Sequence, residues 1–417
     1  MEKFSFVFPG QGTQFLQMGK SFYDNYEIAK QTFEEASDVS SIDIANICFN
    51  GSIGELNDFT IMQLAILTTE VAIFRAYMSD YGLAPQFAVG HSIGEYAALV
   101  SAGAIKFSDA IKIMIKRGEL VSKIIEKNNG HMTIVEKTNL EMINECIEQA
   151  NANDSVYISC YNSNNQYAIS GLNQKLELVE QLLIDREAIV SPLFNSPPIH
   201  SPLMNEVCME FLEYINKFEF YQFKFPIIPN YTGAPLSDPK KIAENLTHHL
   251  INPVLFTSAI DLFYKYGVTT AIEISPKLLL SDFIKENQPN IKTYCYGLIN
   301  ERKALDEMIK SDSNFEKDVP NFIGKCLSIL VTTENKNSNQ NEFKEVIKIY
   351  EKIKVKYNTF SKNKVIPQIE EKAEILDLLI TALKIKKVEK NQLKNCIKSL
   401  LDETNTFYNF KNIINSI

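Results

Sequence analysis

The chain has 417 residues, of which 45% are hydrophobic and 22% charged, and its formal net charge is −9 at pH 7. This length exceeds one ordinary hydrophobic core and predicts two or three domains, while the acidic balance argues against general nucleic-acid binding. Seven scattered cysteines without C-x-x-C spacing indicate reduced thiols and neither a disulfide framework nor a metal site. We expect a cytoplasmic protein, because the N-terminus lacks a signal-peptide pattern and no apolar run approaches the about 20 residues of a membrane span.

An apolar strand is expected at residues 4–8, followed at once by a glycine-rich loop at residues 9–14. The loop fits neither the G-x-G-x-x-G pattern nor a Walker motif, so a tight turn is its simplest interpretation. Its other use would be to present a backbone N–H group to a reacting oxygen. From residue 14 to about residue 81 the pattern is helical, with a loop near residues 50–58.

The next strand, residues 87–89, runs into the pentapeptide G-H-S-I-G at residues 90–94, which fits the G-x-S-x-G pattern of a nucleophile elbow. A helix is expected from residue 95. A strand that turns into a helix within two or three residues leaves no room for side chains beside the turn, and it exposes the hydroxyl at its apex. We therefore interpret Ser92 as a nucleophile; the alternative is a chance match in a chain with 16 glycines.

A change of rhythm near residue 128 indicates an inserted domain. Strand-like segments at residues 131–135, 156–160, 167–170 and 188–190 alternate with helical segments at residues 140–150 and 174–186. The resulting β-α-β-β-α-β order is that of a ferredoxin-like fold. Residues 128–196 are therefore expected to form a small domain inserted into a larger one.

The remainder divides into a return to the large domain and a helical extension. Helices are expected near residues 201–218, 238–250 and 253–266, a strand and turn at residues 227–232, and a strand at residues 270–274. Beyond residue 300, polar linkers at residues 314–320 and 334–341 separate helices near residues 320–330, 343–353, 369–383 and 393–401. This extension contains no recognisable catalytic group, which favours a docking or packing module.

A serine hydroxyl needs a base that takes its proton, so one of the five histidines must reach Ser92 in space. His91 is adjacent in sequence but should point away on an elbow. His200 follows two prolines in an entry loop, which would fix its orientation, and His249 lies near a helix end. On the residues alone, His200 and His249 both remain candidates.

Together these residues resemble the malonyl-CoA:acyl-carrier-protein transacylases and the related acyltransferases of polyketide synthases. The matching segments lie in order at residues 8–14, 90–95, 117–118, 162–171, 196–204, 252–254 and 273–276. The resemblance covers about residues 1–300 and implies an α/β fold: an α/β-hydrolase-like large domain with a parallel sheet, made of residues 1–127 and 197–300, around the ferredoxin-like insert. Residues 301–417 form a helical C-terminal extension that is similar to the tails of some freestanding acyltransferases serving polyketide assembly lines.

The resemblance implies a two-step transfer for fatty-acid or polyketide synthesis. Ser92 would attack the thioester of the substrate malonyl-CoA with His200 as base, and the phosphopantetheine thiol of an acyl carrier protein would then take the malonyl group. Backbone N–H groups of Gln11 and Ile93 would hold the oxyanion, and the backbone carbonyl of His249 would orient His200. We expect a monomer that binds no cofactor.

Arg117 is the residue that implies a carboxylated substrate. A guanidinium buried at the end of a pocket offers a two-pronged match to a free carboxylate, and Gln63, Asn162 and Gln166 would line the same pocket. An arginine in an amphipathic helix is otherwise a common surface ion-pair partner.

Three other functions remain open on the sequence. An acyl hydrolase that clears carrier proteins would share the fold, but such relatives usually lack the arginine. An inactive docking subunit would need neither Ser92, His200 nor Arg117. A secreted-type esterase would normally add an acid to the catalytic pair.

Overall fold

The computed structural model describes residues 3–128, 130–193, 196–311, 322–337, 339–363 and 367–404, and the single residues 365, 406, 410 and 413. The chain divides into two compact units: residues 2–74 with 85–305, and residues 75–84 with 306–417. The polar linker expected at residues 314–320 lies outside the described residues. We refer to residues 322–417 as the tail.

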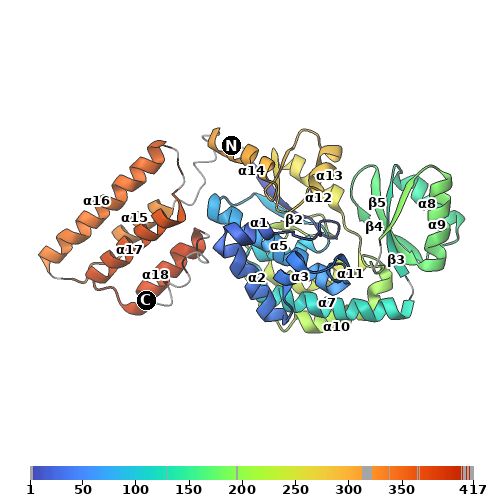
Figure 1. Ribbon diagram of the computed structural model, residues 1–417, viewed down its shortest axis with the longest axis horizontal. Coiled ribbons are helices and arrows are strands. Elements are labelled where there is room, and N and C mark those ends of the chain that lie inside the picture. The colour runs from blue at the N-terminus through green and yellow to red at the C-terminus, as the bar shows by residue number, and fades with distance from the viewer. Residues whose placement is uncertain are drawn as a thin grey trace. The chain divides into compact units, whose positions relative to one another are not determined.

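Five parallel strands form the central sheet of the first unit, in the order β7-β2-β1-β8-β9 (Figure 1). The middle strand, β1 (Phe4–Phe8), is buried at all five positions, as is typical of parallel strands covered on both faces. The Phe6 ring packs edge-on against Phe4 and Phe74, with centroids 5.6 and 5.8 Å away. The other strands are β2 (Phe87–Gly90), β7 (Ile227–Ile228), β8 (Thr270–Glu273) and β9 (Lys292–Cys295).

Helices lie around this sheet (Figure 1). They are α1 (Lys20–Asn25), α2 (Glu27–Ser40), α3 (Ile44–Asn50), α4 (Ile53–Leu56), α5 (Phe59–Asp80), α6 (Gly94–Ser101), α7 (Phe107–Asn128), α10 (Asn205–Ile215), α11 (Ile242–Ile251), α12 (Phe256–Lys265), α13 (Leu280–Asn287) and α14 (Ile299–Ser311). In the described part of the chain, α5 alone is long and apolar enough to cross a membrane. However, 89% of its apolar 18-residue stretch is buried inside the fold. A central helix of a globular protein has the same properties.

The inserted segment forms a four-stranded antiparallel sheet in the order β4-β5-β3-β6. Its elements are β3 (Gly130–Glu136), α8 (Leu140–Gln149), β4 (Val156–Tyr161), β5 (Gln166–Leu172), α9 (Asn173–Asp185) and β6 (Ile189–Leu193). Both helices pack on one face of the sheet over a core that includes Val135, Ile143 and Leu176 (Figure 1). This strand order is that of a ferredoxin-like fold, so the predicted fold class is confirmed.

The described part of the tail contains four helices with a hydrophobic core of their own. They are α15 (Phe322–Thr332), α16 (Gln340–Asn363), α17 (Ile369–Ile385) and α18 (Lys390–Glu403). Ile353, Leu379, Leu383 and Ile397 are fully buried in this core. The apolar spacing recognised in the sequence therefore marks the inner faces of these helices.

The sequence misplaced several short elements. The segment expected as a loop near residues 50–58 contains α4, a four-residue helix held by a capping box between Ser52 and Glu55. By contrast, the strand and turn expected at residues 227–232 are both present: the strand β7 ends at Ile228, because Pro229 follows and lacks an N–H group to continue the ladder, and a turn follows. The edge strand β9 and the helices α13 and α14 were not predicted.

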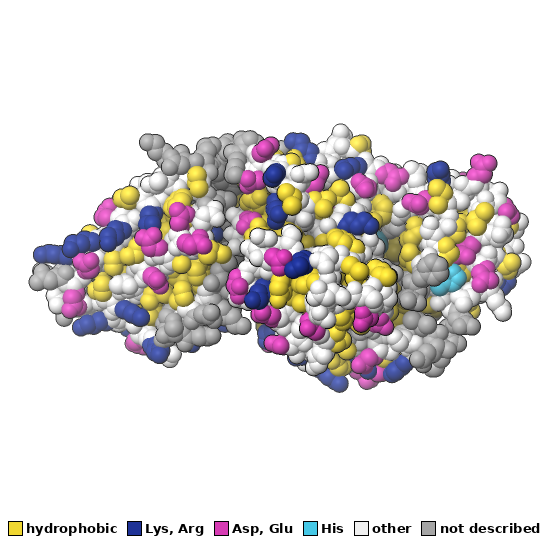
Figure 2. All heavy atoms as spheres, viewed as in Figure 1, with side chains coloured by type: hydrophobic (Ala, Val, Ile, Leu, Met, Phe, Trp, Pro, Cys, Tyr) yellow, Lys and Arg dark blue, Asp and Glu magenta, His cyan; other side chains and the backbone are white. Residues whose placement is uncertain are grey.

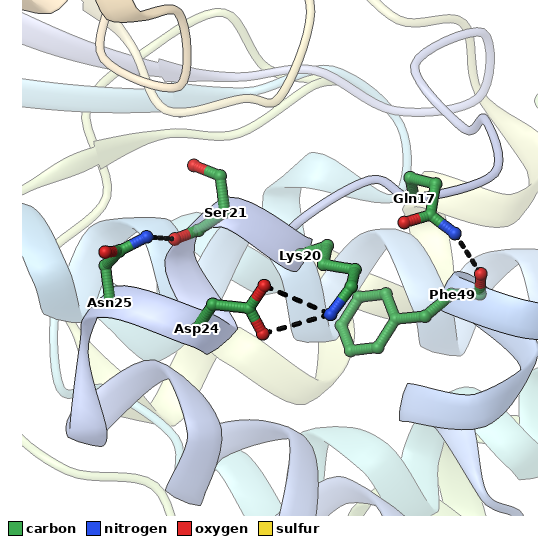
Figure 3. Close-up of polar contacts among 6 residues, drawn as sticks. All are labelled: Gln17, Lys20, Ser21, Asp24, Asn25 and Phe49. Atoms are coloured by element: carbon green, nitrogen blue, oxygen red, sulfur yellow. Dashed lines mark hydrogen bonds and ion pairs between the residues drawn. The ribbon is translucent and has the colours of Figure 1, made fainter.

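The loop after β1 is anchored at both ends. Near its start, the Thr13 hydroxyl donates to the Gly10 carbonyl over 2.9 Å. At its far end, the Gln17 amide donates to the Phe49 carbonyl of α3, and the Lys20 ammonium lies 3.0 Å from Asp24 and 5.4 Å from the Phe49 ring centroid (Figure 3). The Thr13 and Gln17 hydrogen bonds hold in place the loop that carries Gln11, whereas the Lys20–Asp24 ion pair lies within α1.

The end of β1 and the turn after β2 are in such close contact that only glycine fits between them. β1 and β2 are paired in parallel with Phe8 opposite Gly90. A Cβ atom on Gly94 would lie 2.0 Å from the Phe8 carbonyl oxygen, and one on Gly90 would lie 2.0 Å from the Gly94 carbonyl carbon. The two outer glycines of the pentapeptide are therefore required by packing.

We predict that Gly94→Ala destabilises the fold by about 1–3 kcal/mol or more, because the added methyl group must displace the backbone of β1. Gly54→Ala is the matched control, since the nearest atom to a Cβ there is 3.9 Å away. Urea unfolding of both variants measures the difference. Equal stability of the two variants would contradict the packing argument.

Candidate functional site

Ser92 lies at the apex of the turn between β2 and α6. Its φ angle of 52° is in the left-handed region, which a non-glycine residue adopts only when its surroundings hold it there. The side chain is 8% exposed. The first turn of α6 follows directly, so the N-terminal end of that helix is close to the serine hydroxyl.

His200 is the histidine that the structure places at Ser92. Its Nε2 atom lies 2.8 Å from Ser92 Oγ, and its Nδ1 atom lies 2.8 Å from the backbone carbonyl oxygen of His249. Because a carbonyl only accepts, Nδ1 carries the proton and Nε2 is free to accept from the serine hydroxyl. His200 is also in the left-handed region, with φ 58°, and its N–H donates to the Leu250 carbonyl over 2.8 Å.

The environment keeps this imidazole neutral. Burial and then the positive charge of Arg117 lower the pKa of His200 to about 3. Burial also lowers the pKa of His249, whose ring centroid lies 4.7 Å from that of His200. A neutral His200 beside a serine hydroxyl is the state that a general base requires.

Two backbone N–H groups next to Ser92 are free to bind an oxyanion. Among the described residues, neither Gln11 N–H nor Ile93 N–H has an intramolecular acceptor. A Cβ atom built on Gly10 would lie 2.5 Å from the His91 carbonyl oxygen and 3.5 Å from Ser92 Cβ, so the loop after β1 lies directly against the elbow. Unpaired N–H groups beside a serine hydroxyl are the kind of donor that can bind an oxyanion.

Arg117 lies on α7 and is completely buried. One terminal nitrogen, Nη1, donates to the Gln63 side-chain carbonyl, and the guanidinium lies 6.0 Å from the Phe59 ring centroid. The other edge, made of Nε and Nη2, has no partner in the described part of the chain. Burial lowers the pKa of Arg117, although an arginine stays charged in proteins. A buried guanidinium with one free edge is suited to bind a carboxylate by two parallel hydrogen bonds.

The other residues expected in the pocket fall into two groups. Gln63 contacts Arg117, as described above. Asn162 and Gln166 instead form a hydrogen-bonded chain with the elbow: His91 Nε2 lies 2.7 Å from Asn162 Oδ1, and the Asn162 amide donates to Gln166 over 2.8 Å. These two residues therefore join the inserted sheet to the elbow, and none of their hydrogen bonds in the described part of the chain goes to Arg117.

Asn230 is a functional residue that the sequence interpretation missed. Its Oδ1 atom accepts the Ser92 N–H over 2.9 Å, and its Nδ2 atom donates to the Gly90 carbonyl over 2.8 Å. One side chain thus binds the backbone on both sides of His91, at the Gly90 carbonyl before it and the Ser92 N–H after it. A polar residue after a buried strand of a parallel sheet was the available signal, because such strand ends face functional sites.

The carboxylate of Glu95, which also binds Asn245, holds Asn230 in place. The Glu95 carboxylate accepts the Asn230 backbone N–H over 2.8 Å, and it also accepts from the side-chain amides of Asn230 and Asn245. Burial raises the pKa of Glu95 to about 7, although these donors favour its charged form. In the sequence analysis, Glu95 was the start of a helix and the last residue of the matching segment at residues 90–95, with no role of its own.

Among the residues described, no three His, Cys, Asp or Glu side chains are grouped so that they could hold a metal ion.

The amino-acid sequence is similar to those of known proteins. Residues 5–323 match the family model described as an acyl transferase domain. The chain is 33% identical over 341 residues to a malonyl CoA-acyl carrier protein transacylase of Bacillus subtilis, covering 81% of this chain and 85% of that protein. It is 31% identical over 309 residues to the protein of the same description from Staphylococcus aureus strain MRSA252, covering 74% and 99%.

Solved structures are similar as well. A malonyl-transacylase in complex with a type II PKS acyl-carrier protein matches with a TM-score of 0.70 and 30% identity, covering 73% of this chain and 99% of that chain. An acyl carrier protein S-malonyltransferase of Vibrio cholerae matches with a TM-score of 0.69 and 31% identity, over the same shares.

The lowered pKa of His200 predicts an unusual pH profile. The rate of Ser92 labelling by a serine-reactive fluorophosphonate should stay level from pH 8 to about pH 5, whereas a base of ordinary pKa would be half protonated near pH 6.5. In Arg117→Ala, labelling should begin to slow at a higher pH than in the parent. The substitution removes the positive charge of Arg117, which is one cause of the lowered pKa of His200. Glu95→Gln serves as the control, since it removes the other group that titrates near pH 7. An acid limb near pH 6.5 in the parent would contradict this assignment.

Asn230→Ala should slow Ser92 labelling and lower stability together. The change leaves the Ser92 N–H and the Gly90 carbonyl without their partner, at about 1–3 kcal/mol for each buried group. Asn25→Ala is a matched control, because the Asn25 amide makes an exposed hydrogen bond to Ser21. Labelling kinetics and thermal unfolding measure both effects. An unchanged labelling rate in a folded Asn230→Ala variant would show that the elbow holds its shape without this residue.

Proposed function

The chain belongs to the acyl transferase family of the malonyl CoA-acyl carrier protein transacylases, and on this premise we propose how its residues move a malonyl group from malonyl-CoA to an acyl carrier protein. The sequence interpretation of the reaction agrees with the family. The roles of the individual residues given below are our proposals, supported by the geometry of the site.

In the first step, Ser92 Oγ attacks the thioester carbonyl carbon while His200 Nε2 takes the hydroxyl proton. Gln11 N–H and Ile93 N–H bind the oxyanion that forms, and a donor in such a position typically contributes about 3 kcal/mol. The carbon–sulfur bond then breaks, and the departing thiolate takes the proton from His200. The product is a malonyl ester on Ser92 and free coenzyme A.

The second step reverses the proton transfers with a different thiol. The phosphopantetheine thiol of the carrier protein gives its proton to His200 Nε2 and attacks the ester carbonyl. The carbon–oxygen bond to Ser92 breaks, and His200 returns the proton to Ser92 Oγ. The His249 carbonyl keeps Nδ1 protonated in both steps, which explains how a serine and a histidine suffice without an acid.

The free edge of Arg117 is the observation that carries the choice of acyl group. Nε and Nη2 are buried and lack a partner among the described residues, and a malonyl carboxylate would satisfy both. A hydrogen bond to a charged group contributes about 1.5–3 kcal/mol. An acetyl group would leave the edge unsatisfied, so malonyl-CoA is preferred.

We further propose that this is a cytoplasmic, monomeric enzyme that needs no bound cofactor and that serves a polyketide assembly line. All seven cysteines are free thiols, which suits a reducing compartment. The tail extends beyond residue 323, where the family model ends, and a separate helical module is suited to recognition of a large assembly. Comparing KM for carrier proteins of fatty-acid and polyketide synthesis tests this choice.

Arg117→Ala should reduce malonyl loading of Ser92 at least 100-fold, because two charge-assisted hydrogen bonds are lost. Acetyl loading should stay level or rise. Intact-protein mass spectrometry after incubation with each CoA thioester measures the adducts, and Lys112→Ala, at an exposed position of the same helix, is the control. Fast hydrolysis of acetyl carrier protein by the parent, without a malonyl adduct, would favour an acyl hydrolase instead.

A further inference from the structure

Two of the five histidines have side chains that the fold buries almost completely. His200 is 1% exposed and His249 is 0% exposed, whereas His91, His131 and His248 remain partly exposed. Histidine takes up only a small part of the face that Figure 2 shows. The proposed reaction uses the backbone carbonyl of His249 and leaves its buried side chain without a role.

The His249 ring contacts two other buried rings. Its centroid lies 4.7 Å from that of His200, with 38° between the ring planes, and 6.3 Å from that of Tyr96, with 42° between the planes. Both separations are those of aromatic rings in contact. Tyr96 comes from α6, His249 from the last turn of α11 and His200 from the loop before α10. The His249 side chain thus fills the space beside His200.

Hydrogen bonds do not explain the position of this ring. Neither Nδ1 nor Nε2 of His249 has a hydrogen-bond partner among the residues that the structure describes, and the same is true of the Tyr96 hydroxyl. A buried polar atom without a partner costs free energy. The contribution that remains to the side chain is its bulk, which packs against His200 and keeps water out of the space beside it.

The end of α11 holds His200 by hydrogen bonds that leave one motion open. Nδ1 donates to the His249 carbonyl and the backbone N–H donates to the Leu250 carbonyl, each over 2.8 Å. Both are carbonyls of the last helical turn, which lack partners within a helix. When Ser92 carries an acyl group, its Oγ has no proton to donate, so the Nδ1 bond alone directs the ring. One such bond lets the ring plane turn about it, and packing against a second side chain limits that rotation.

Burial of His200 also has an electrostatic consequence. It is the largest cause of the lowered pKa of His200, followed by the charge of Arg117 on α7, and His91 at the elbow adds a smaller contribution. Burial, His200 and the same two groups lower the pKa of His249. Tyr96 stays neutral, because burial raises its pKa. A smaller side chain at position 249 would admit water beside His200, and the pKa of His200 would rise toward its ordinary value.

We propose that His249 is a positioning residue whose side chain, by its bulk, fixes the plane of the His200 ring and keeps water away from it. The proposal rests on the proposed function, in which His200 accepts the proton of Ser92. It gives His249 two separate contacts with His200, one through the backbone carbonyl and one through the side chain. Substitutions test the second contact alone, because any residue at this position keeps the carbonyl.

The test compares His249→Ala with His249→Leu in the full-length protein. Alanine removes most of the side chain, whereas leucine is close to histidine in volume and lacks the ring nitrogens. In His249→Ala, Ser92 labelling by the fluorophosphonate at pH 8 should fall about tenfold or more. Labelling should also begin to slow at a pH about one unit higher than in the parent. In His249→Leu, the rate should stay within about threefold of the parent, with the same pH profile.

Transfer kinetics separate positioning from substrate binding. In His249→Ala, kcat for malonyl transfer to the carrier protein should fall about tenfold, while KM for malonyl-CoA changes by less than about twofold, because Arg117 and Gln63 are untouched. His248→Ala is the matched control. It makes the same substitution one residue earlier on α11, where the side chain is partly exposed and stacks on Tyr231 with ring centroids 5.3 Å apart. The control should match the parent in labelling, pH profile and transfer.

Several outcomes would overturn the proposal. They are parent-like labelling in a folded His249→Ala variant, an equal loss in His248→Ala, and an equal loss in His249→Leu, which would show that the ring nitrogens act. A slower rate with an unchanged pH profile and a raised KM would indicate a general loss of structure and would overturn it as well. If His249→Ala does not fold, His249→Val removes less volume and should show a smaller change in the same direction; a parent-like His249→Val variant overturns the proposal.

The failure of the proposed function is distinguishable from the failure of this inference. Absence of a malonyl adduct on Ser92 in the parent refutes the proposed function itself. A normal adduct in the parent, with parent-like labelling in His249→Ala, refutes the role of the His249 side chain alone.

Discussion

The contact between the end of β1 and the turn at Ser92 is the constraint on which the site depends. Gly94 touches the Phe8 carbonyl, and Gly10 touches the His91 carbonyl, at distances that exclude a Cβ atom. This contact brings the Gln11 loop beside the Ile93 N–H, and it holds Ser92 in a left-handed conformation. Asn230 and the buried Glu95 then fix the same turn from the other side. Ser92 and the two N–H groups that we propose as oxyanion donors are consequently positioned by backbone packing.

Burial gives the site its chemical character. His200 and Arg117 are 1% and 0% exposed, and the removal of water explains both the lowered pKa of His200 and the need of Arg117 for an anionic partner. The same burial strengthens charge interactions inside the site. We therefore propose that a malonyl carboxylate pairs with the free edge of Arg117 and that this binding positions the thioester at Ser92.

The sequence predicted the parts of this account that rest on local patterns. The glycines at residues 90–94 and the strand–helix alternation of the insert specify backbone geometry directly, and both the parallel sheet and the ferredoxin-like sheet are present. Asn230 and Asn245 could not be predicted. They bind Glu95, which lies 135 and 150 positions before them in the chain. Asn162 and Gln166 were expected to line the pocket of Arg117, and their hydrogen bonds to His91 and to each other were not indicated by the sequence. Contacts across the fold decided each of these cases.

The most direct test of the central claim is a crystal structure of the enzyme with a malonyl group on Ser92. The account predicts that the free carboxylate lies about 2.7–3.1 Å from both Nε and Nη2 of Arg117. The ester carbonyl oxygen should point toward the N–H groups of Gln11 and Ile93. A carboxylate turned to solvent, with the free edge of Arg117 still unpaired, would contradict the account.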